Sequence, residues 1–228
     1  MYFIIQFGVE FIVDKLLRAS EYGICLFSFD VLQDFLKNNK VRSKKLLKTF
    51  QKDKKLYLNS QKEGVWFPMA GINFFEYVIK VDGFDEPFDG EWEQKLEYSG
   101  FNLEIKNGLW ISGFGSWLEF KPEQYGGEEG SYAVKTPFGD ILYYYNKNEV
   151  YRKSLEGKIS YTDYRYDVPD GKYLLSVKGY VRGEKAKYTY GNCGFFFSLK
   201  KVDEFDGFKN PREDEEYDFN VGSRAVDS

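Results

Sequence analysis

The chain has 228 residues, of which 43% are hydrophobic and 20% aromatic, and its formal net charge is −4. This apolar content is enough for a sizeable core and excludes a chain that is disordered throughout. The sequence contains no histidine, which excludes Ser-His-Asp and Cys-His catalysis and histidine-ligated zinc sites.

The apolar start of the chain, MYFIIQFGVEFIV, has no basic region before it and no small-residue cleavage site. Glu10 and Asp14 also interrupt it well short of a bilayer span. We therefore expect a buried first element in a cytoplasmic protein, with no membrane contact. Its apolar residues then recur at helical spacing, at Val9, Ile12, Val13, Leu16 and Leu17.

Two further helices are expected before residue 55. The first has Ser28 or Asp30 as its cap and an apolar stripe at Leu32, Phe35 and Leu36. Ser43 can cap the second, whose inward residues are Leu46, Leu47 and Phe50. The short apolar run at 24–27 is either a strand or a buried link. The sequence thus predicts a mainly helical part over residues 1–54.

From residue 55 the pattern changes to short alternating segments separated by turn signals, which is typical of an antiparallel sandwich. Phe101, Leu103 and Ile105 alternate with polar residues, and Asn107-Gly108 follows. Because that pair suits a type I′ turn, we predict a hairpin there. Segments 141–145, 158–166, 172–182 and 195–202 also have strand character. The predicted fold class is α+β: a short N-terminal helical part followed by an antiparallel β-sandwich over residues 55–202.

Charge is distributed unevenly along the chain. Residues 1–62 contain 12 Lys/Arg and 6 Asp/Glu, whereas residues 63–228 contain 20 and 30, a net of −10. The C-terminal tail, residues 203–228, is acidic: Asp203, Glu204, Asp206, Glu213, Asp214, Glu215, Glu216 and Asp218. An acidic surface repels nucleic acid and attracts basic proteins. The expected partner is therefore a basic protein, without direct nucleic-acid binding.

The strongest candidate site is the segment DGFDEPFDGEWE at 82–93. Its carboxylates can meet Lys or Arg on a basic partner, and a Trp among acids can anchor an interface. The alternative is a solvated connection whose aromatic side chains fold back onto the sheet. The predicted partner-binding residues are Asp82, Asp85, Glu86, Asp89, Glu91, Trp92 and Glu93.

Three other features have both a functional and a structural interpretation. The acidic tail can bind a basic partner or simply keep the chain soluble. The nine Lys/Arg between Lys37 and Lys55 can follow nucleic acid or form the solvated face of helices. The four tryptophans and the Tyr run at 143–145 can stack sugars or fill a core. We predict no catalytic residue, no metal site and no cofactor. Cys25 and Cys193 are expected to be isolated buried thiols, although a single disulfide is also compatible with the sequence.

Two blocks of the sequence are similar to a known family. The first contains YVIKVDGF, an acidic loop ending in GEWE, and FNLEIKNGLWISG; the second is ISYTDYRYDVPDGKYLLSVKGYVR, with Val168, Pro169, Gly171, Tyr173 and Leu175 at the pattern positions. Together they resemble the competence-J-like inhibitors of DNA-entry nucleases and, more broadly, bacterial toxin immunity proteins. The resemblance spans about residues 77–182. It implies a β-sandwich that blocks a toxin or nuclease, and of its residues we carry over only the acidic loop.

Composition, charge and this resemblance lead to one functional hypothesis and one alternative. The hypothesis is a bacterial, non-enzymatic immunity or inhibitor protein that blocks a basic toxin or nuclease through an acidic surface. The alternative is a carbohydrate- or small-ligand-binding β-sandwich module, which requires an exposed row of Trp or Tyr. The sequence leaves the oligomeric state and the identity of the partner open.

Overall fold

In the computed structural model of this chain, the described residues are 15–73, 75–137, 139–153, 157, 159–183, 191–212 and 216–222. The fold is mostly β, with 46% strand and 17% helix. All twelve described strands belong to one sheet. The predicted α+β class, with a helical N-terminal part ahead of a sandwich, is therefore wrong.

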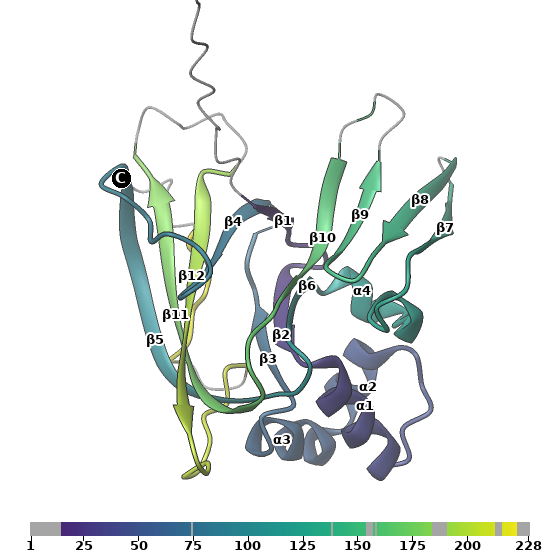
Figure 1. Cartoon of the computed structure of the whole chain (residues 1–228), viewed down its shortest axis with the longest axis horizontal. Helices are drawn as coiled ribbons and strands as arrows, with labels where there is room; N and C mark the ends of the chain where they lie inside the picture. Colours follow the sequence, from purple (N-terminus) through teal and green to yellow (C-terminus); the bar gives the residue numbers. More distant parts are fainter. Residues whose placement is uncertain are drawn as a thin grey trace, which may run out of the picture.

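The sheet is built around a path of nine strands in the order β3-β2-β6-β10-β1-β4-β12-β11-β5, and an arm of three strands, β9-β8-β7, leaves it at β10 (Figure 1). The strands are β1 (Leu16–Arg18), β2 (Gly23–Phe27), β3 (Trp66–Ala70), β4 (Glu76–Val81), β5 (Trp92–Ile105), β6 (Leu109–Gly113), β7 (Gly130–Thr136), β8 (Gly139–Tyr145), β9 (Glu149–Lys153), β10 (Ile159–Tyr166), β11 (Gly171–Arg182) and β12 (Cys193–Val202). Most pairs are antiparallel, but β1 with β10 and β12 with β4 are parallel.

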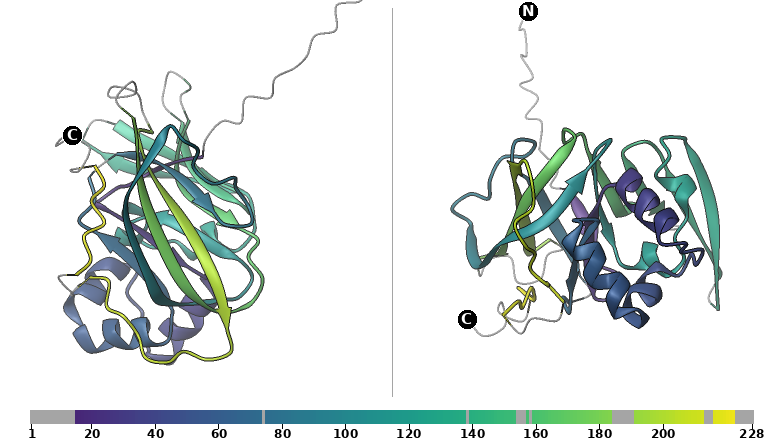
Figure 2. Two further views of the ribbon diagram at one scale, coloured as in Figure 1. Left: turned by 90° about the vertical axis from the view of Figure 1, so that its left-hand side faces the viewer. Right: turned by 90° about the horizontal axis from the view of Figure 1, so that it is seen from below.

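The sheet curves until its two edges meet. The Glu104 N–H, near the end of β5, donates a hydrogen bond of 2.7 Å to the Gly64 carbonyl just before β3. The Phe67 and Phe101 rings from these two strands lie 4.6 Å apart. Figure 2 shows β5, β11 and β12 side by side on one wall of this nearly closed sheet. This nearly closed sheet encloses an apolar interior that residues from strands far apart in sequence fill together.

Helices cover the outside of one part of the sheet. They are α1 (Phe29–Asn38), α2 (Leu46–Lys52), α3 (Lys54–Lys62) and the short α4 (Gly115–Leu118), with a 3-10 turn, η1, at Pro122–Gln124. The helices predicted on the Leu32 and Leu46 stripes are confirmed as α1 and α2. Leu16 and Leu17, predicted as helical, lie in strand β1 instead; Val9, Ile12 and Val13 are outside the described residues. The run at 24–27 is a strand. The N-terminal residues thus supply central strands of the sheet as well as its helical cover (Figure 2).

Two hydrophobic cores lie on the two faces of the sheet. Along β2, Ile24 and Leu26 point into the curled interior, whereas Cys25 and Phe27 point toward the helices. The two sets separate because successive side chains of a strand point to opposite faces of the sheet. Because both faces are covered, β2 and β6 are buried at every position, and such strands show continuous apolar runs rather than alternation.

The chain turns sharply at Asn107-Gly108, as predicted, with φ of 59° and 93° at the two residues. The predicted hairpin is nevertheless wrong, because β5 pairs with β11 and β6 pairs with β10. The Asn107 N–H donates to the Asp170 carboxylate (2.9 Å) and the Arg165 guanidinium donates to the Asn107 carbonyl (2.8 Å). These hydrogen bonds join the turn after β5 to the end of β10 and the connection from β10 to β11, at one corner of the sheet.

Neither cysteine forms a disulfide. Cys25 and Cys193 are free and buried, as predicted, and burial raises the pKa of both thiols, that of Cys193 to about 11. No helix among the described residues is long and apolar enough to span a bilayer.

Candidate functional site

The predicted acidic segment connects β4 to β5 on the side of the sheet away from the helices (Figure 1). Asp82, Glu86, Asp89 and Glu91 are exposed. The Asp89 carboxylate accepts a hydrogen bond from the Glu91 N–H (3.0 Å), which fixes the end of the loop. Among the described residues, Asp82, Glu86 and Glu91 take part in no ion pair. The loop therefore presents uncompensated negative charge.

Asp85 and Glu93 have local partners. The Asp85 carboxylate accepts from the Val81 N–H at 3.0 Å and lies 3.4 Å from the Lys15 ammonium. Glu93 pairs with Lys95 at 2.8 Å. Asp85 is partly buried, and its contacts tie the loop to the end of β4. We conclude that Asp85 has a structural task in addition to any contact with a partner.

The aromatic residues of the loop divide into two kinds. The Phe88 ring packs 4.5 Å from both the Trp92 and the Tyr180 rings, and the Arg182 guanidinium stacks over Trp92 at 4.4 Å. These residues brace the loop against β11, as in the fold-back alternative. Phe84 instead is 45% exposed, which makes it the accessible aromatic side chain of the segment.

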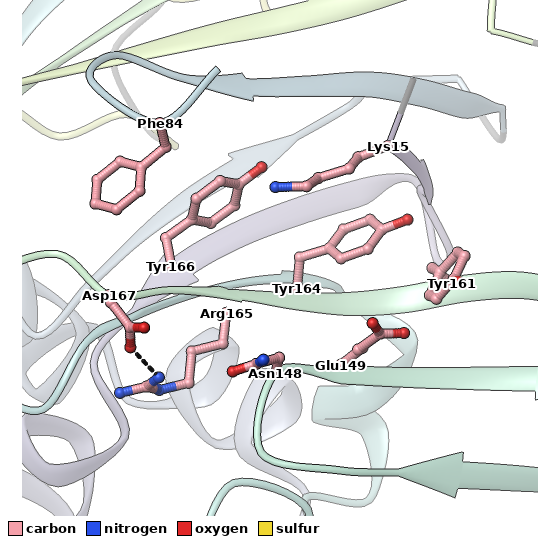
Figure 3. Close-up of a pocket in the computed structure, with 9 residues that line it drawn as sticks. All are labelled: Lys15, Phe84, Asn148, Glu149, Tyr161, Tyr164, Arg165, Tyr166 and Asp167. Atoms are coloured by element: carbon pink, nitrogen blue, oxygen red, sulfur yellow. Dashed lines mark hydrogen bonds and ion pairs between the residues drawn. The ribbon is translucent and has the colours of Figure 1, made fainter. Parts of the chain in front are cut away.

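A pocket of about 450 Å³ lies directly beside Phe84 (Figure 3). Its aromatic walls are Phe84, Tyr161, Tyr164 and Tyr166, and its polar residues are Lys15, Asn148, Glu149, Arg165 and Asp167. The Phe84 and Tyr166 rings meet edge to face at 5.7 Å. The acidic loop and the pocket therefore form one continuous surface.

The charges of this pocket are only partly paired. Lys15 is held by Asp85 and lies 4.4 Å above the Tyr166 ring, and Arg165 forms an ion pair with Asp167. Glu149 has no ion pair among the described residues. Partial burial raises its pKa, an effect that the positive charge of Lys15 partly opposes. A half-buried carboxylate thus lines the pocket with the tyrosine rings; Lys15 acts on it through space, but no described residue forms a direct ion pair with it.

A row of tyrosines extends from the pocket across the arm. Tyr144, Tyr151 and Tyr161 stand directly opposite one another on β8, β9 and β10. Successive rings lie 5.5 and 5.8 Å apart, and Tyr161 stacks on Tyr164 at 4.9 Å. The register places them on one face because cross-strand neighbours share a side of the sheet. Of the predicted Tyr run at 143–145, only Tyr144 joins this face; Tyr143 and Tyr145 pack against the helix-side core.

The other predicted features have structural surroundings. Trp66, Trp110 and Trp117 are buried in the helix-side core, as in the core interpretation. All nine basic residues between Lys37 and Lys55 are exposed. In the acidic tail, Phe219 is 1% exposed and Tyr217 packs on Phe101 at 5.0 Å; Glu213, Asp214 and Glu215 are outside the described residues.

A fully buried carboxylate, Asp163, belongs to β10 and stands opposite Ser112 of β6. It accepts hydrogen bonds from the Ser112 hydroxyl, from Tyr125 (2.9 Å) and from Ser116 (3.0 Å). Burial raises its pKa, and the hydroxyl donors oppose that rise. Because Asp163 and Tyr125 are buried, this cluster is a polar element of the core rather than a site open to substrate.

The pocket and Glu149 were not identified from the sequence. They combine residue 15, the acidic loop and segments 148–149 and 161–167, which the fold alone brings together. A partial signal exists in the Tyr residues at 144, 151, 161, 164 and 166, whose spacing is compatible with one sheet face.

No protein-family model, curated protein or solved structure matches this chain. Among the described residues, no three His, Cys, Asp or Glu side chains are grouped so that they could hold a metal ion.

Proposed function

We propose that this chain is a non-enzymatic immunity or inhibitor protein that binds a basic toxin or nuclease through the surface formed by the acidic loop, residues 82–93, and the adjoining tyrosine-lined pocket. The observation that supports this most strongly is that exposed carboxylates, which form no ion pair within the described part of the chain, adjoin the accessible aromatic ring of Phe84. The carboxylates would engage basic groups at the partner's active site and exclude its substrate.

The loop is also suited to fast association. Phe88, Trp92 and Arg182 brace it, so little ordering would be needed on binding, and preorganisation lowers the entropic cost of association. Clustered negative charge steers a positive partner and raises the association rate, an effect that salt screens. Two free buried cysteines suit a reducing compartment, and we place the complex in the cytoplasm.

The test begins with a tagged pull-down from native cells at low and high salt, followed by titration of the captured protein's activity. A basic partner whose activity falls to zero at stoichiometric addition is the expected result. Neutralising the loop should lower the association rate at least tenfold at low salt and flatten its salt dependence. The loop variant is D82N/E86Q/E91Q; the matched control, with the same charge change on exposed residues elsewhere, is E63Q/E119Q/D140N.

Two results would refute the proposal. One is a partner whose activity is unaffected by saturating protein. The other is equal loss of association rate in the loop variant and the control, because net charge rather than this surface would then explain binding.

The tyrosine row gives a second candidate function specific support. Tyr144, Tyr151 and Tyr161 form a half-exposed aromatic strip on one face, and such strips can stack sugar rings. Titration with a panel of oligosaccharides, followed by NMR of the tyrosine ring signals, tests this function. Saturable shifts limited to these three rings would favour a carbohydrate-binding module.

A further inference from the structure

We propose that the pocket between Phe84 and Glu149 binds a guanidinium group, and that in the complex this group is the side chain of an arginine on the partner. The second half of this statement rests on the proposed inhibitor function. The first half concerns the pocket alone and can be tested without any partner.

The charge balance of the pocket favours a cation. Its two basic residues are already held by carboxylates of the same chain, Lys15 by Asp85 and Arg165 by Asp167. An incoming anion would have to compete with these pairs. Glu149, in contrast, is partly buried and has no ion pair among the residues that the structure describes. A partly desolvated carboxylate gains most from a cation that replaces its lost water.

The aromatic walls favour the same ligand. Figure 3 shows the Glu149 carboxylate beside the rings of Tyr161 and Tyr164. Burial raises the pKa of both phenols, and the negative charge of Glu149 adds to that rise. The two rings stack on each other at 4.9 Å with an angle of 29° between their planes. Ring faces carry negative electrostatic potential and attract cations placed over them. The carboxylate and the two rings therefore line the same pocket, and both attract a cation placed in it.

A guanidinium fits this combination better than an ammonium. It is planar, so it can lie flat on a tyrosine ring while its N–H groups point in the plane toward a carboxylate. It is also more weakly hydrated than an ammonium and loses less on entering a partly apolar pocket. The volume of about 450 Å³ is in the range of small-ligand sites and leaves room for the aliphatic stem of an arginine.

The location of the pocket connects it to the acidic loop. Phe84 belongs to the loop and lines the pocket, and Asp85 next to it forms an ion pair with Lys15, which lines the same pocket. A basic segment lying along the exposed carboxylates would pass the pocket mouth. An arginine there would be an anchor of the kind that dominates interface energetics.

The experiment is an NMR titration of the full chain with three small probes of similar size: propylguanidinium, butylammonium and butyrate. We expect saturable shifts with propylguanidinium at Glu149, Tyr161 and Arg165, with a dissociation constant on the order of 1 mM, as suits a fragment. Butylammonium should bind at least threefold more weakly, and butyrate should leave the pocket signals unchanged.

Variants connect the signal to the named groups. Glu149→Gln should weaken propylguanidinium binding at least tenfold, whereas Glu63→Gln, the same change on an exposed residue at the end of α3, should leave it unchanged. Tyr161→Leu should weaken binding and Tyr161→Phe should keep it, because the ring face rather than the hydroxyl holds the cation. The amide spectrum of each variant verifies the fold.

Absence of propylguanidinium shifts, retention of binding in Glu149→Gln, or preferential binding of butyrate would overturn the pocket assignment. The partner half is tested separately. If the probe binds but Glu149→Gln leaves affinity for the captured partner unchanged, the pocket assignment holds and its role in the complex is wrong. If the captured partner's activity is unaffected by this chain, the inhibitor function fails while the probe result still stands.

Discussion

The buried carboxylate of Asp163 provides a test of how polar groups are satisfied in the core between β6 and β10. Its Oδ1 accepts from Ser112 and Tyr125, and its Oδ2 accepts from Ser116. Asp163→Ala would leave three hydroxyls without this acceptor. At about 1 kcal/mol for each hydroxyl, and more where the group is fully buried, the loss of unfolding free energy should be about 3–5 kcal/mol.

Asp163→Asn should behave differently. An amide oxygen at the Oδ1 position keeps the bonds from Ser112 and Tyr125, and the amide nitrogen can donate to Ser116 once its hydroxyl rotates. The substitution also removes the ionised form whose burial raises the pKa of Asp163. We therefore expect a change within about 1 kcal/mol at neutral pH, several times smaller than that of Asp163→Ala.

The pH dependence gives the same test a second readout. The pKa of Asp163 is raised in the folded state, so the folded chain holds this proton more tightly than the unfolded chain does. The stability gained from this proton is complete below about pH 3.9, the pKa of an aspartate in the unfolded chain. It is lost as pH rises through the higher pKa of Asp163 in the folded state. Wild type should therefore gain stability relative to Asp163→Asn as pH falls.

The assay is urea unfolding followed by far-UV circular dichroism between pH 4 and 8, with m-values compared to verify two-state behaviour. Equal losses for Asp163→Asn and Asp163→Ala would refute the acceptor argument. A wild type whose stability falls relative to Asp163→Asn toward acid would show that the pKa is lowered instead of raised.

Three further predictions use matched pairs of variants and the same unfolding assay. Trp66 and Trp117 stack at 4.6 Å and are both buried, but the Trp66 indole N–H donates to Ser60 at 2.8 Å, whereas that of Trp117 has no partner among the described residues. Trp66→Phe should therefore lower the free energy of unfolding by about 2 kcal/mol more than Trp117→Phe does. Equal losses of unfolding free energy would contradict this prediction. Gly108→Ala would place a Cβ 2.7 Å from the Arg165 guanidinium, whereas the Cβ of Gly83→Ala, at a similar φ, meets nothing within 4 Å. Gly108→Ala should therefore lose at least about 1 kcal/mol more unfolding free energy than Gly83→Ala. A larger loss for Gly83→Ala would contradict this prediction. Glu149→Gln should raise the melting temperature at neutral pH, because burial raises the pKa of Glu149 and the removed charge opposes folding; a lower melting temperature would show that the carboxylate has a stabilising partner.

The parts of the fold that the sequence predicts correctly are those determined within one segment. The stripe ending at Leu36 forms α1 because its apolar face can be recognised from neighbouring residues alone, and Asn107-Gly108 turns because both positions adopt positive φ. The same turn shows the limit: β5 and β6 leave it toward different partners, β11 and β10, whose paired residues lie more than fifty positions away in the sequence. Pairing at such separation depends on contacts that no local pattern encodes.

The candidate site shows a similar division. The exposure of Asp82 and Glu86 is expected for a charged loop. The structural role of Asp85, in contrast, depends on its ion pair with Lys15, which is distant in the sequence. Leu16 and Leu17 have helical spacing in the sequence but form a strand, because β1 fills the position between β4 and β10. Tertiary pairing there outweighs local periodicity.

The two cysteines can serve as independent probes of internal motion. Cys25 belongs to the core under the helices and Cys193 to the interior of the curled sheet, and each can react with a thiol reagent only when its own surroundings open. Labelling rates of Cys25→Ser and Cys193→Ser chains would thus time the detachment of the helical layer and the opening of the sheet separately. A ligand that binds only at the edge of the pocket should slow the labelling of Cys193 and leave the labelling rate of Cys25 unchanged.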